Sequence, residues 1–90
     1  MNNELQNITF YIPNVKAHIT DREVEILKLI SFELTSKEIA SSLFISIHTV
    51  ETHKKNLKFK LKVKNTAGLI RKGFELSILN IAQTHLTLSA

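Results

Sequence analysis

The side chains with the most varied chemistry in this chain lie together in the segment SIHTVETHKK, from Ser46 to Lys55. Two histidines, a glutamate and two lysines could hold a metal ion or bind a polyanion. A metal site on one helix commonly uses two ligands at positions i and i+4. His48 and His53 are five residues apart, and the chain has no cysteine. The spacing therefore argues against a metal site, and His53 is expected either to pack against the fold or to face a phosphate.

Other catalytic arrangements are also missing from the sequence. It shows no Ser/His/Asp or Cys/His set, no Gly-rich phosphate loop and no paired carboxylates. We therefore expect no enzymatic activity and no cofactor. The lack of cysteine fits a reducing cytoplasm. No apolar run approaches the roughly 18 residues that span a bilayer, so no membrane association is expected.

Positive charge is concentrated in the second half of the chain. Residues 1–50 carry six acids and four bases, whereas residues 51–90 carry two acids and eight bases. Six lysines fall between positions 54 and 64. Positive charge concentrated in one part of a chain favours binding to a polyanion, above all to nucleic acid. A solvated lysine-rich helix face has the same composition, so charge alone leaves both interpretations open.

The elements that must position these residues are predicted to be helices. Four positions carry the signal of a helix start. At each, a side-chain oxygen can accept a hydrogen bond from a backbone N–H, and apolar residues then follow at spacings of three and four. The signals are Thr20 with Glu23, Thr35 with Glu38, Ser46, and Asn65. They predict a helix over about 21–32, a short second helix, a third ending near Leu61, and a fourth over about 66–79.

These signals predict an all-α fold, a compact four-helix domain over residues 20–80. Residues 1–19 lack a helical period and are expected to form an extended arm or a linker, and residues 81–90 a C-terminal tail. The connector Leu43–Ile45 is apolar and is expected to be tucked into the core. Two short helices joined by such a tight turn form a helix-turn-helix, whose second helix enters the major groove.

Several motifs occur in one order that resembles a known family. They are T-x-R-E-x-E-I-L at 20–27, T-S-K-E-I-A at 35–40, L-F-I-S-x-x-T-V-x-x-H at 43–53 and K-L-x-V-K-N at 60–65. Over about residues 18–80 the chain resembles the LuxR-type (GerE/FixJ/NarL C-terminal) helix-turn-helix DNA-binding domain.

This resemblance implies sequence-specific binding of double-stranded DNA by a bacterial transcription regulator that acts as a homodimer on DNA, with RNA polymerase as a further candidate partner. The chain would be either a single-domain regulator or the effector domain of a longer one.

The resemblance also implies roles for particular residues. The expected contacts to base edges are Glu51, Thr52 and Lys55. The expected contacts to the DNA backbone are Lys37, Ser46, Thr49, Lys54 and Lys58. The fourth helix would supply the dimer interface through Leu69, Ile70, Phe74 and Ile78. From the residues alone, these last four could equally belong to the core, and we expect a mixed role.

Glu51 has two interpretations that the sequence leaves open. A glutamate on the recognition helix can accept a hydrogen bond from cytosine N4. The same residue stands four positions before Lys55, the spacing of a favourable intrahelical ion pair. The question is whether Glu51 reads a base or only holds Lys55.

Two turns depart from the family pattern. Glycine is common after the first helix and after the K-L motif, where this chain has Phe32-Glu33-Leu34 and Lys62. A left-handed conformation at a helix end costs a non-glycine residue roughly 1 kcal/mol. Either these positions carry that cost, or the helices end differently.

Two other functions remain open at this stage. A sigma-factor region 4 module has the same helix-turn-helix arrangement, although the well-formed fourth helix argues against this assignment. A protein-interaction module would use the basic helix to bind an acidic partner and would not need DNA.

Overall fold

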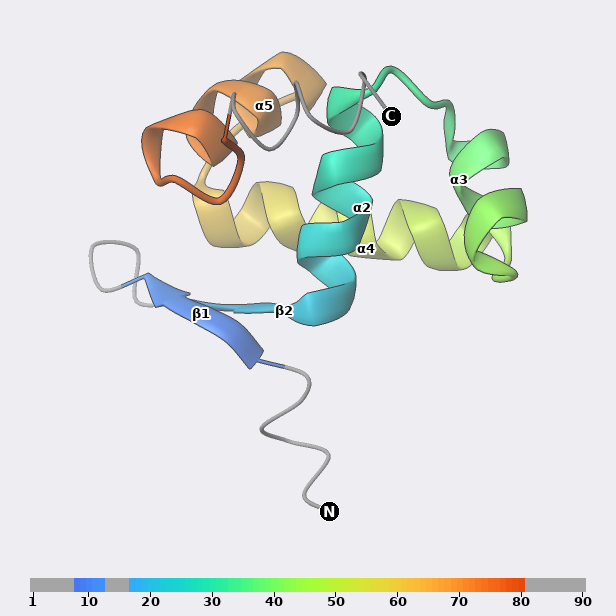
Figure 1. Cartoon of the computed structure of the whole chain (residues 1–90), viewed down its shortest axis with the longest axis horizontal. Coiled ribbons are helices and arrows are strands. Elements are labelled where there is room, and N and C mark those ends of the chain that lie inside the picture. Colours follow the sequence, from blue (N-terminus) through green and yellow to red (C-terminus); the bar gives the residue numbers. More distant parts are fainter. Residues whose placement is uncertain (1–7, 13–16, 81–90) are drawn as a thin grey trace.

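The chain folds into four helices preceded by two short strands (Figure 1). The computed structural model describes residues 8–12 and 17–80. The helices are α2 (Asp21–Ser31), α3 (Ser36–Leu43), α4 (Ile47–Leu61) and α5 (Thr66–Glu75), and the strands are β1 (Ile8–Ile12) and β2 (Ala17–Thr20). The compact four-helix architecture is thus confirmed, and a small antiparallel strand pair is added to it.

All four helices start where the capping signals predict. At α2 the Thr20 hydroxyl accepts the backbone N–H of Glu23 at 3.1 Å, and the Glu23 carboxylate accepts the backbone N–H of Thr20 at 3.0 Å. The same i, i+3 cap bond occurs at the other three starts. Those caps pair Thr35 with Glu38, Ser46 with Thr49, and Asn65 with Gly68. Local side-chain chemistry therefore sets each helix start.

The four helices also end alike, each with a left-handed residue that is not glycine. These residues are Glu33, Phe44, Lys62 and Ser77, with φ of 68°, 58°, 58° and 62°. In each case the next backbone N–H reaches back five residues to a carbonyl, as in a Schellman motif. The bonds join Leu34 to Leu29, Ile45 to Ala40, Val63 to Lys58, and Ile78 to Gly73. The two turns without glycine therefore do adopt the costly conformation.

Replacing Glu33 with glycine is expected to stabilise the domain. Glu33 is exposed, and glycine enters the left-handed region without the steric cost that other residues carry there, roughly 1 kcal/mol. The expected rise in melting temperature is about 4–8 °C for a domain of this size. Thermal unfolding followed by circular dichroism measures it. The matched control is Glu33→Ala, which keeps a Cβ atom; an equal gain in both variants would contradict the explanation.

The connector between α3 and α4 is only partly tucked into the core, which corrects the prediction for Phe44. Leu43 and Ile45 pack against the core, whereas Phe44 is 95% exposed. The cause is the left-handed backbone of Phe44, which ends α3 and interrupts the helical period that would carry its side chain inward.

The last helix is shorter than predicted and ends at Glu75 rather than near residue 79. After the left-handed Ser77, the backbone N–H groups of Ile78 and Leu79 both bond to the carbonyl of Gly73 at 2.9 Å. A Cβ atom on Gly73 would lie 2.7 Å from Leu79 Cδ1. The glycine therefore allows the chain to fold back over α5, and Ile78 and Leu79 become buried.

The two strands attach part of the N-terminal segment to the domain. They pair antiparallel, with Ile12 opposite Ala17 and Ile8 opposite Thr20, and the register is irregular between Ile8 and Phe10. Ile19 of β2 is fully buried in the core. The predicted arm therefore contributes a core side chain, while residues 1–7 and the predicted tail at 81–90 lie outside the described residues.

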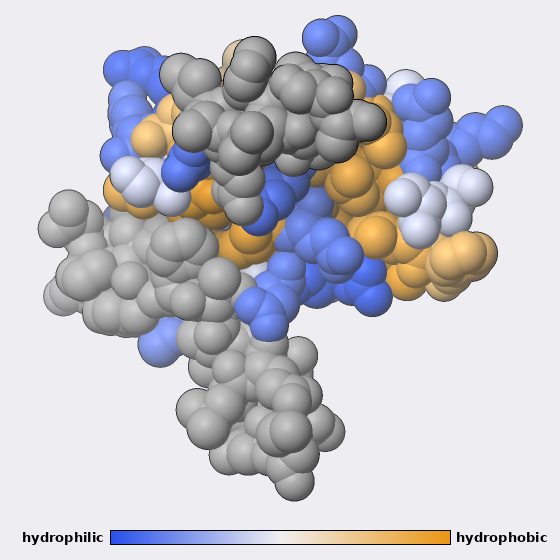
Figure 2. All heavy atoms as spheres, in the orientation of Figure 1, coloured by the Kyte–Doolittle hydropathy of each residue, from blue (hydrophilic) through white to orange (hydrophobic). Residues whose placement is uncertain are grey.

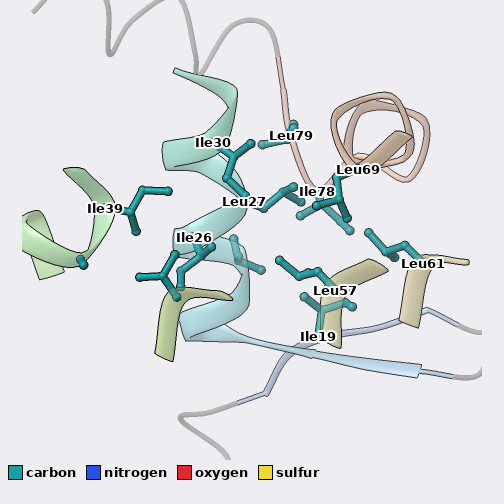
Figure 3. Close-up of a cluster of buried hydrophobic side chains, with 13 residues drawn as sticks. Ile19, Ile26, Leu27, Ile30, Ile39, Leu57, Leu61, Leu69, Ile78 and Leu79 are labelled. Carbon is teal, nitrogen blue, oxygen red and sulfur yellow. The ribbon is translucent and has the colours of Figure 1, made fainter. Parts of the chain in front are cut away.

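The core holds α4 in place by its inner face. Helix α4 crosses α2, with α3 near its start and α5 near its end (Figure 1). Val50, Leu57 and Leu61 of α4 are each 0% exposed. Figure 3 shows this core, formed with Ile19 of β2, Ile26, Leu27 and Ile30 of α2, Ile39 of α3, Leu69 of α5, and the following Ile78 and Leu79. Because one side of α4 is buried, its opposite side must face solvent.

Candidate nucleic-acid interface

The exposed side of α4 carries the three residues predicted to contact base edges. Glu51, Thr52 and Lys55 are all exposed. Thr52 and Lys55 are three residues apart and share one side of the helix. The exposed Phe59 follows four positions later on the same side. The structure therefore brings the predicted base-contacting residues together on the surface of one helix.

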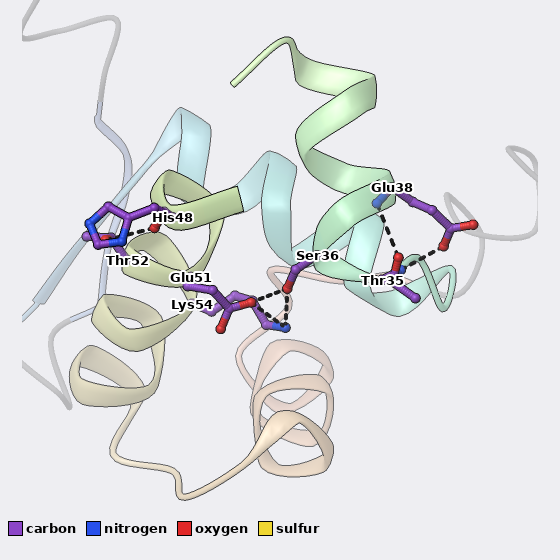
Figure 4. A network of polar contacts seen from close by, with 7 residues as sticks. All are labelled: Thr35, Ser36, Glu38, His48, Glu51, Thr52 and Lys54. Atoms are coloured by element: carbon purple, nitrogen blue, oxygen red, sulfur yellow. Dashed lines mark hydrogen bonds and ion pairs between the residues drawn. The ribbon is translucent and has the colours of Figure 1, made fainter. Parts of the chain in front are cut away.

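Thr52 and Lys55 differ in how much of their hydrogen-bonding capacity is already used. The Thr52 hydroxyl donates to the backbone carbonyl of His48 at 3.0 Å (Figure 4). Lys55 makes no hydrogen bond or ion pair within the part of the chain that the structure describes. Its ammonium group is therefore available to an external acceptor.

Glu51 is engaged by neighbours other than Lys55. Its carboxylate accepts a hydrogen bond from the Ser36 hydroxyl of α3 and lies 3.7 Å from Lys54 Nζ. The Ser36 hydrogen bond is the largest influence and lowers the pKa of the Glu51 carboxyl; burial opposes it, and Lys54 and Lys58 each lower the pKa a little further. The ion pair of Glu51 is therefore made with Lys54, three residues on, and not with Lys55.

The residues predicted to contact the DNA backbone lie on α3 and α4. Ser46 and Thr49 stand at the start of α4, where the two hydroxyl oxygens are 2.9 Å apart. Lys37 is exposed on α3, Lys58 is half-buried on α4, and neither forms a hydrogen bond or ion pair with a described residue. Lys54 differs, because its side chain is only 19% exposed and donates to Ser36 Oγ at 3.0 Å.

One lysine of the basic run faces inward, a feature that the sequence did not reveal. Lys60 Nζ lies 2.7 and 2.9 Å from the two carboxylate oxygens of Glu23, whose side chain is 4% exposed. The two residues are 37 positions apart, so no local spacing signals their contact. Lys60 therefore serves the fold and does not add to the outward basic surface.

His48 and His53 do not form part of a metal cluster with other described residues. His48 is exposed, and His53 is half-buried with its Nδ1 out of solvent and without a hydrogen-bond partner among the described residues. No three His, Asp or Glu side chains within 8–12 and 17–80 converge as a metal site. Within the same ranges, no helix has the length and apolar character needed to cross a bilayer.

The predicted dimer interface on α5 is reduced to two residues. Leu69 is 0% exposed and Ile78 is 3% exposed, because both pack inside the core of a single chain. They are therefore not available to a second copy, which corrects the prediction for these two. Phe74 is 37% exposed, and Ile70 is half-buried.

Apolar atoms reach the surface elsewhere too. Figure 2 shows hydrophobic surface between hydrophilic side chains on the face it presents. The large exposed apolar residues of the described chain are Phe44, Ile47, Phe59 and Phe74.

Comparison with known proteins relates this geometry to one family. A family profile described as "Bacterial regulatory proteins, luxR family" matches residues 17–72. The chain is 48% identical over 62 residues to the transcriptional regulatory protein MctR of Rhizobium johnstonii, across 69% of this chain and 29% of MctR. It is 43% identical over 63 residues to the uncharacterized response regulatory protein YgeK of Escherichia coli, across 70% of this chain and 43% of YgeK.

A solved structure agrees with these sequence matches. The crystal structure of the response regulator ChrA, from a heme-sensing two-component system, aligns with a TM-score of 0.65 at 33% identity. The alignment covers 67% of this chain and 30% of that of ChrA. This chain therefore spans less than half the length of each of these relatives.

The profile match covers more than half of the chain and contains both α3 and α4. This match identifies the chain as a LuxR-type domain and not as a sigma-factor module. The chain belongs to the luxR family of bacterial regulatory proteins and carries the helix-turn-helix DNA-binding domain of a transcriptional regulator.

Proposed function

We propose that this chain binds double-stranded DNA in a sequence-specific manner, with α4 as the recognition helix in the major groove. The observation that carries the proposal is the division of α4 into two sides. Its inner side is buried at Val50, Leu57 and Leu61, while Thr52 and Lys55 are exposed. In a helix-turn-helix protein, the first turns of the second helix approach the base edges.

The two exposed residues have distinct chemistry toward a base pair. The Lys55 ammonium can donate to guanine O6 and N7. The Thr52 hydroxyl already donates to His48, so Thr52 offers its oxygen lone pairs and its methyl group, which suits contact with a thymine methyl. Glu51 was the third predicted base contact, but its carboxylate is held by Ser36 and Lys54.

Phosphate contacts would fix the register of α4 without reading sequence. Lys37 and Lys58 supply unpaired ammonium groups, and Ser46 and Thr49 supply hydroxyls at the start of the helix. Two copies would occupy half-sites about one helical turn apart, joined through Ile70 and Phe74 of α5.

The DNA-binding domain would span residues 20–80 with Ile19 of β2 packed into its core, preceded by an N-terminal arm or linker and followed by a C-terminal tail at 81–90. The protein acts in the cytoplasm as a regulator without enzymatic activity or cofactor. RNA polymerase is a further candidate partner, because a regulator seated at a promoter lies beside it.

Selection from a random duplex library tests the proposal. We expect a defined sequence to be enriched and to bind at least about a thousandfold more tightly than a scrambled duplex of the same composition. The logarithm of the affinity should fall linearly with the logarithm of salt concentration, with a slope of about −0.9 for each phosphate contacted. Titration by fluorescence anisotropy measures both, and no binding to either duplex at about 50 mM salt would contradict the proposal.

A further inference from the structure

Ser36 connects the two helices of the helix-turn-helix through a single hydroxyl group. It lies in the first turn of α3, and its Oγ donates to Glu51 Oε2 while accepting from Lys54 Nζ at 3.0 Å (Figure 4). Glu51 and Lys54 lie 15 and 18 positions further along the chain. Ser36 is half-buried, so the group lies at the contact between α3 and α4.

This arrangement changes what Lys54 can offer to DNA. The Glu51 carboxylate lies 3.7 Å from Lys54 Nζ, and the Lys54 side chain is only 19% exposed. Its positive charge is therefore partly neutralised within the chain. The Glu51 side chain is 56% exposed, so a negative group also stands at the surface that would face the phosphates and would repel them.

The arrangement also determines what Glu51 can reach. To accept a hydrogen bond from cytosine N4, its carboxylate would have to leave both Ser36 and Lys54. To pair with Lys55, it would have to give up the Ser36 hydroxyl. While the carboxylate stays with α3, Lys55 remains unpaired and can approach a base.

We propose that Ser36 is a positioning residue for DNA recognition, which holds Glu51 beside Lys54 so that this carboxylate limits the sequence-independent attraction of α4 for DNA and leaves Lys55 free. The inference rests on the proposed function. It assigns Glu51 to an internal partner and to no base, and it gives α3 a part in specificity that lies outside the residues predicted from sequence.

Substitution of Glu51 shows whether this residue contacts a base or limits DNA binding, because the first role predicts weaker binding and the second predicts tighter binding. In Glu51→Gln, Lys54 loses its counter-ion and becomes one more phosphate contact in each chain. We expect tighter binding to the selected and the scrambled duplex by the same factor, and a salt slope steeper by about 0.9 per chain. The gain should therefore be about three to four times larger per chain at about 50 mM than at about 200 mM salt. Weaker binding to the selected duplex alone, with a changed base preference at one position, would overturn the proposal.

Substitution of Ser36 tests the positioning role itself. In Ser36→Ala, Glu51 is released toward Lys55, so Lys54 becomes free to contact phosphate while Lys55 is partly paired. Because such an intrahelical pair is weak, we expect the ratio of selected-duplex to scrambled-duplex affinity to fall only about twofold per chain. Added to Glu51→Gln, the same substitution should change nothing, since no carboxylate remains to be held. An equal loss in both backgrounds would mean that Ser36 only supports the fold, which overturns the proposal.

A measurement without DNA keeps this test separate from that of the proposed function. Carboxyl titration by NMR should show the Glu51 pKa below its ordinary value in the unmodified chain, because Ser36 and the nearby lysines stabilise the carboxylate. The pKa should rise in Ser36→Ala. An unchanged titration overturns the role of Ser36 whether or not DNA binds, whereas a failure of the unmodified chain to bind any duplex overturns the proposed function.

Discussion

Replacing Lys60 with methionine is expected to lower the free energy of unfolding by about 3 kcal/mol, because it leaves a buried carboxylate without its counter-ion. Glu23 is 4% exposed, and Lys60 lies 2.7 Å from it. Removing one partner of a buried pair typically costs about 3–5 kcal/mol. We expect the lower end, since Glu23 keeps its hydrogen bond from the backbone N–H of Thr20. Urea unfolding followed by circular dichroism measures the change.

A second substitution provides the matched control. Glutamine can serve the capping box in place of glutamate, so Glu23→Gln added to Lys60→Met removes the stranded charge and keeps the cap of α2. The double variant should unfold within about 1 kcal/mol of the unmodified chain, as expected when a buried pair is replaced as a whole. A double variant as unstable as Lys60→Met alone would show that the packing of Lys60, and not its charge, matters.

The ion pair also shows why the lysine-rich helix cannot be treated as one uniform basic surface. Lys60 ties the last part of α4 to the first turn of α2, and Lys54 is held by Ser36 and Glu51. Lys55 and Lys58 of the same helix form no ion pair with any residue that the structure describes. Two of these four lysines therefore fix the helix, and two are left to bind a polyanion.

The helix starts could be predicted from the sequence because the capping chemistry is local. Thr20 and Glu23, for example, are three residues apart and bond to each other's backbone. The predicted ends of α2 and α4 agree with the structure to within one residue, whereas the predicted end of α5 is too late in the chain, because no glycine marks it. Ser77 takes the left-handed conformation and ends α5 early, and Phe44 does the same for α3 and so points outward.

The candidate site also has a part that could be predicted from the sequence and a part that could not. The recognition helix could be found from its motifs and from its apolar spacing, and Thr52 and Lys55 lie on its exposed side as that spacing requires. The contacts of Ser36 with Glu51 and Lys54 could not be found, because they cross between helices and depend on how α3 packs against α4. Leu69 and Ile78 fit an interface by composition alone, and only the folded chain shows that they are used inside the core.

Replacing Lys55 with alanine is expected to weaken binding to the selected duplex about 10- to 100-fold per chain, the usual worth of one good contact between a side chain and a base edge. Lys55 is the exposed basic residue of the recognition face without an internal partner, so its loss removes the donor proposed for guanine O6 and N7. A scrambled duplex should lose far less. Repeated selection with the variant should enrich sequences that are relaxed at the position Lys55 reads.

The control for Lys55 is Lys58→Ala, which removes a lysine from the same helix with the same change in charge. If Lys58 contacts phosphate only, its loss should weaken selected and scrambled duplexes by one common factor and make the salt slope shallower by about 0.9 per chain. The two alanine variants would then differ in specificity and not in charge. Equal losses on every sequence for both variants would contradict base reading by Lys55 and reduce it to another phosphate contact.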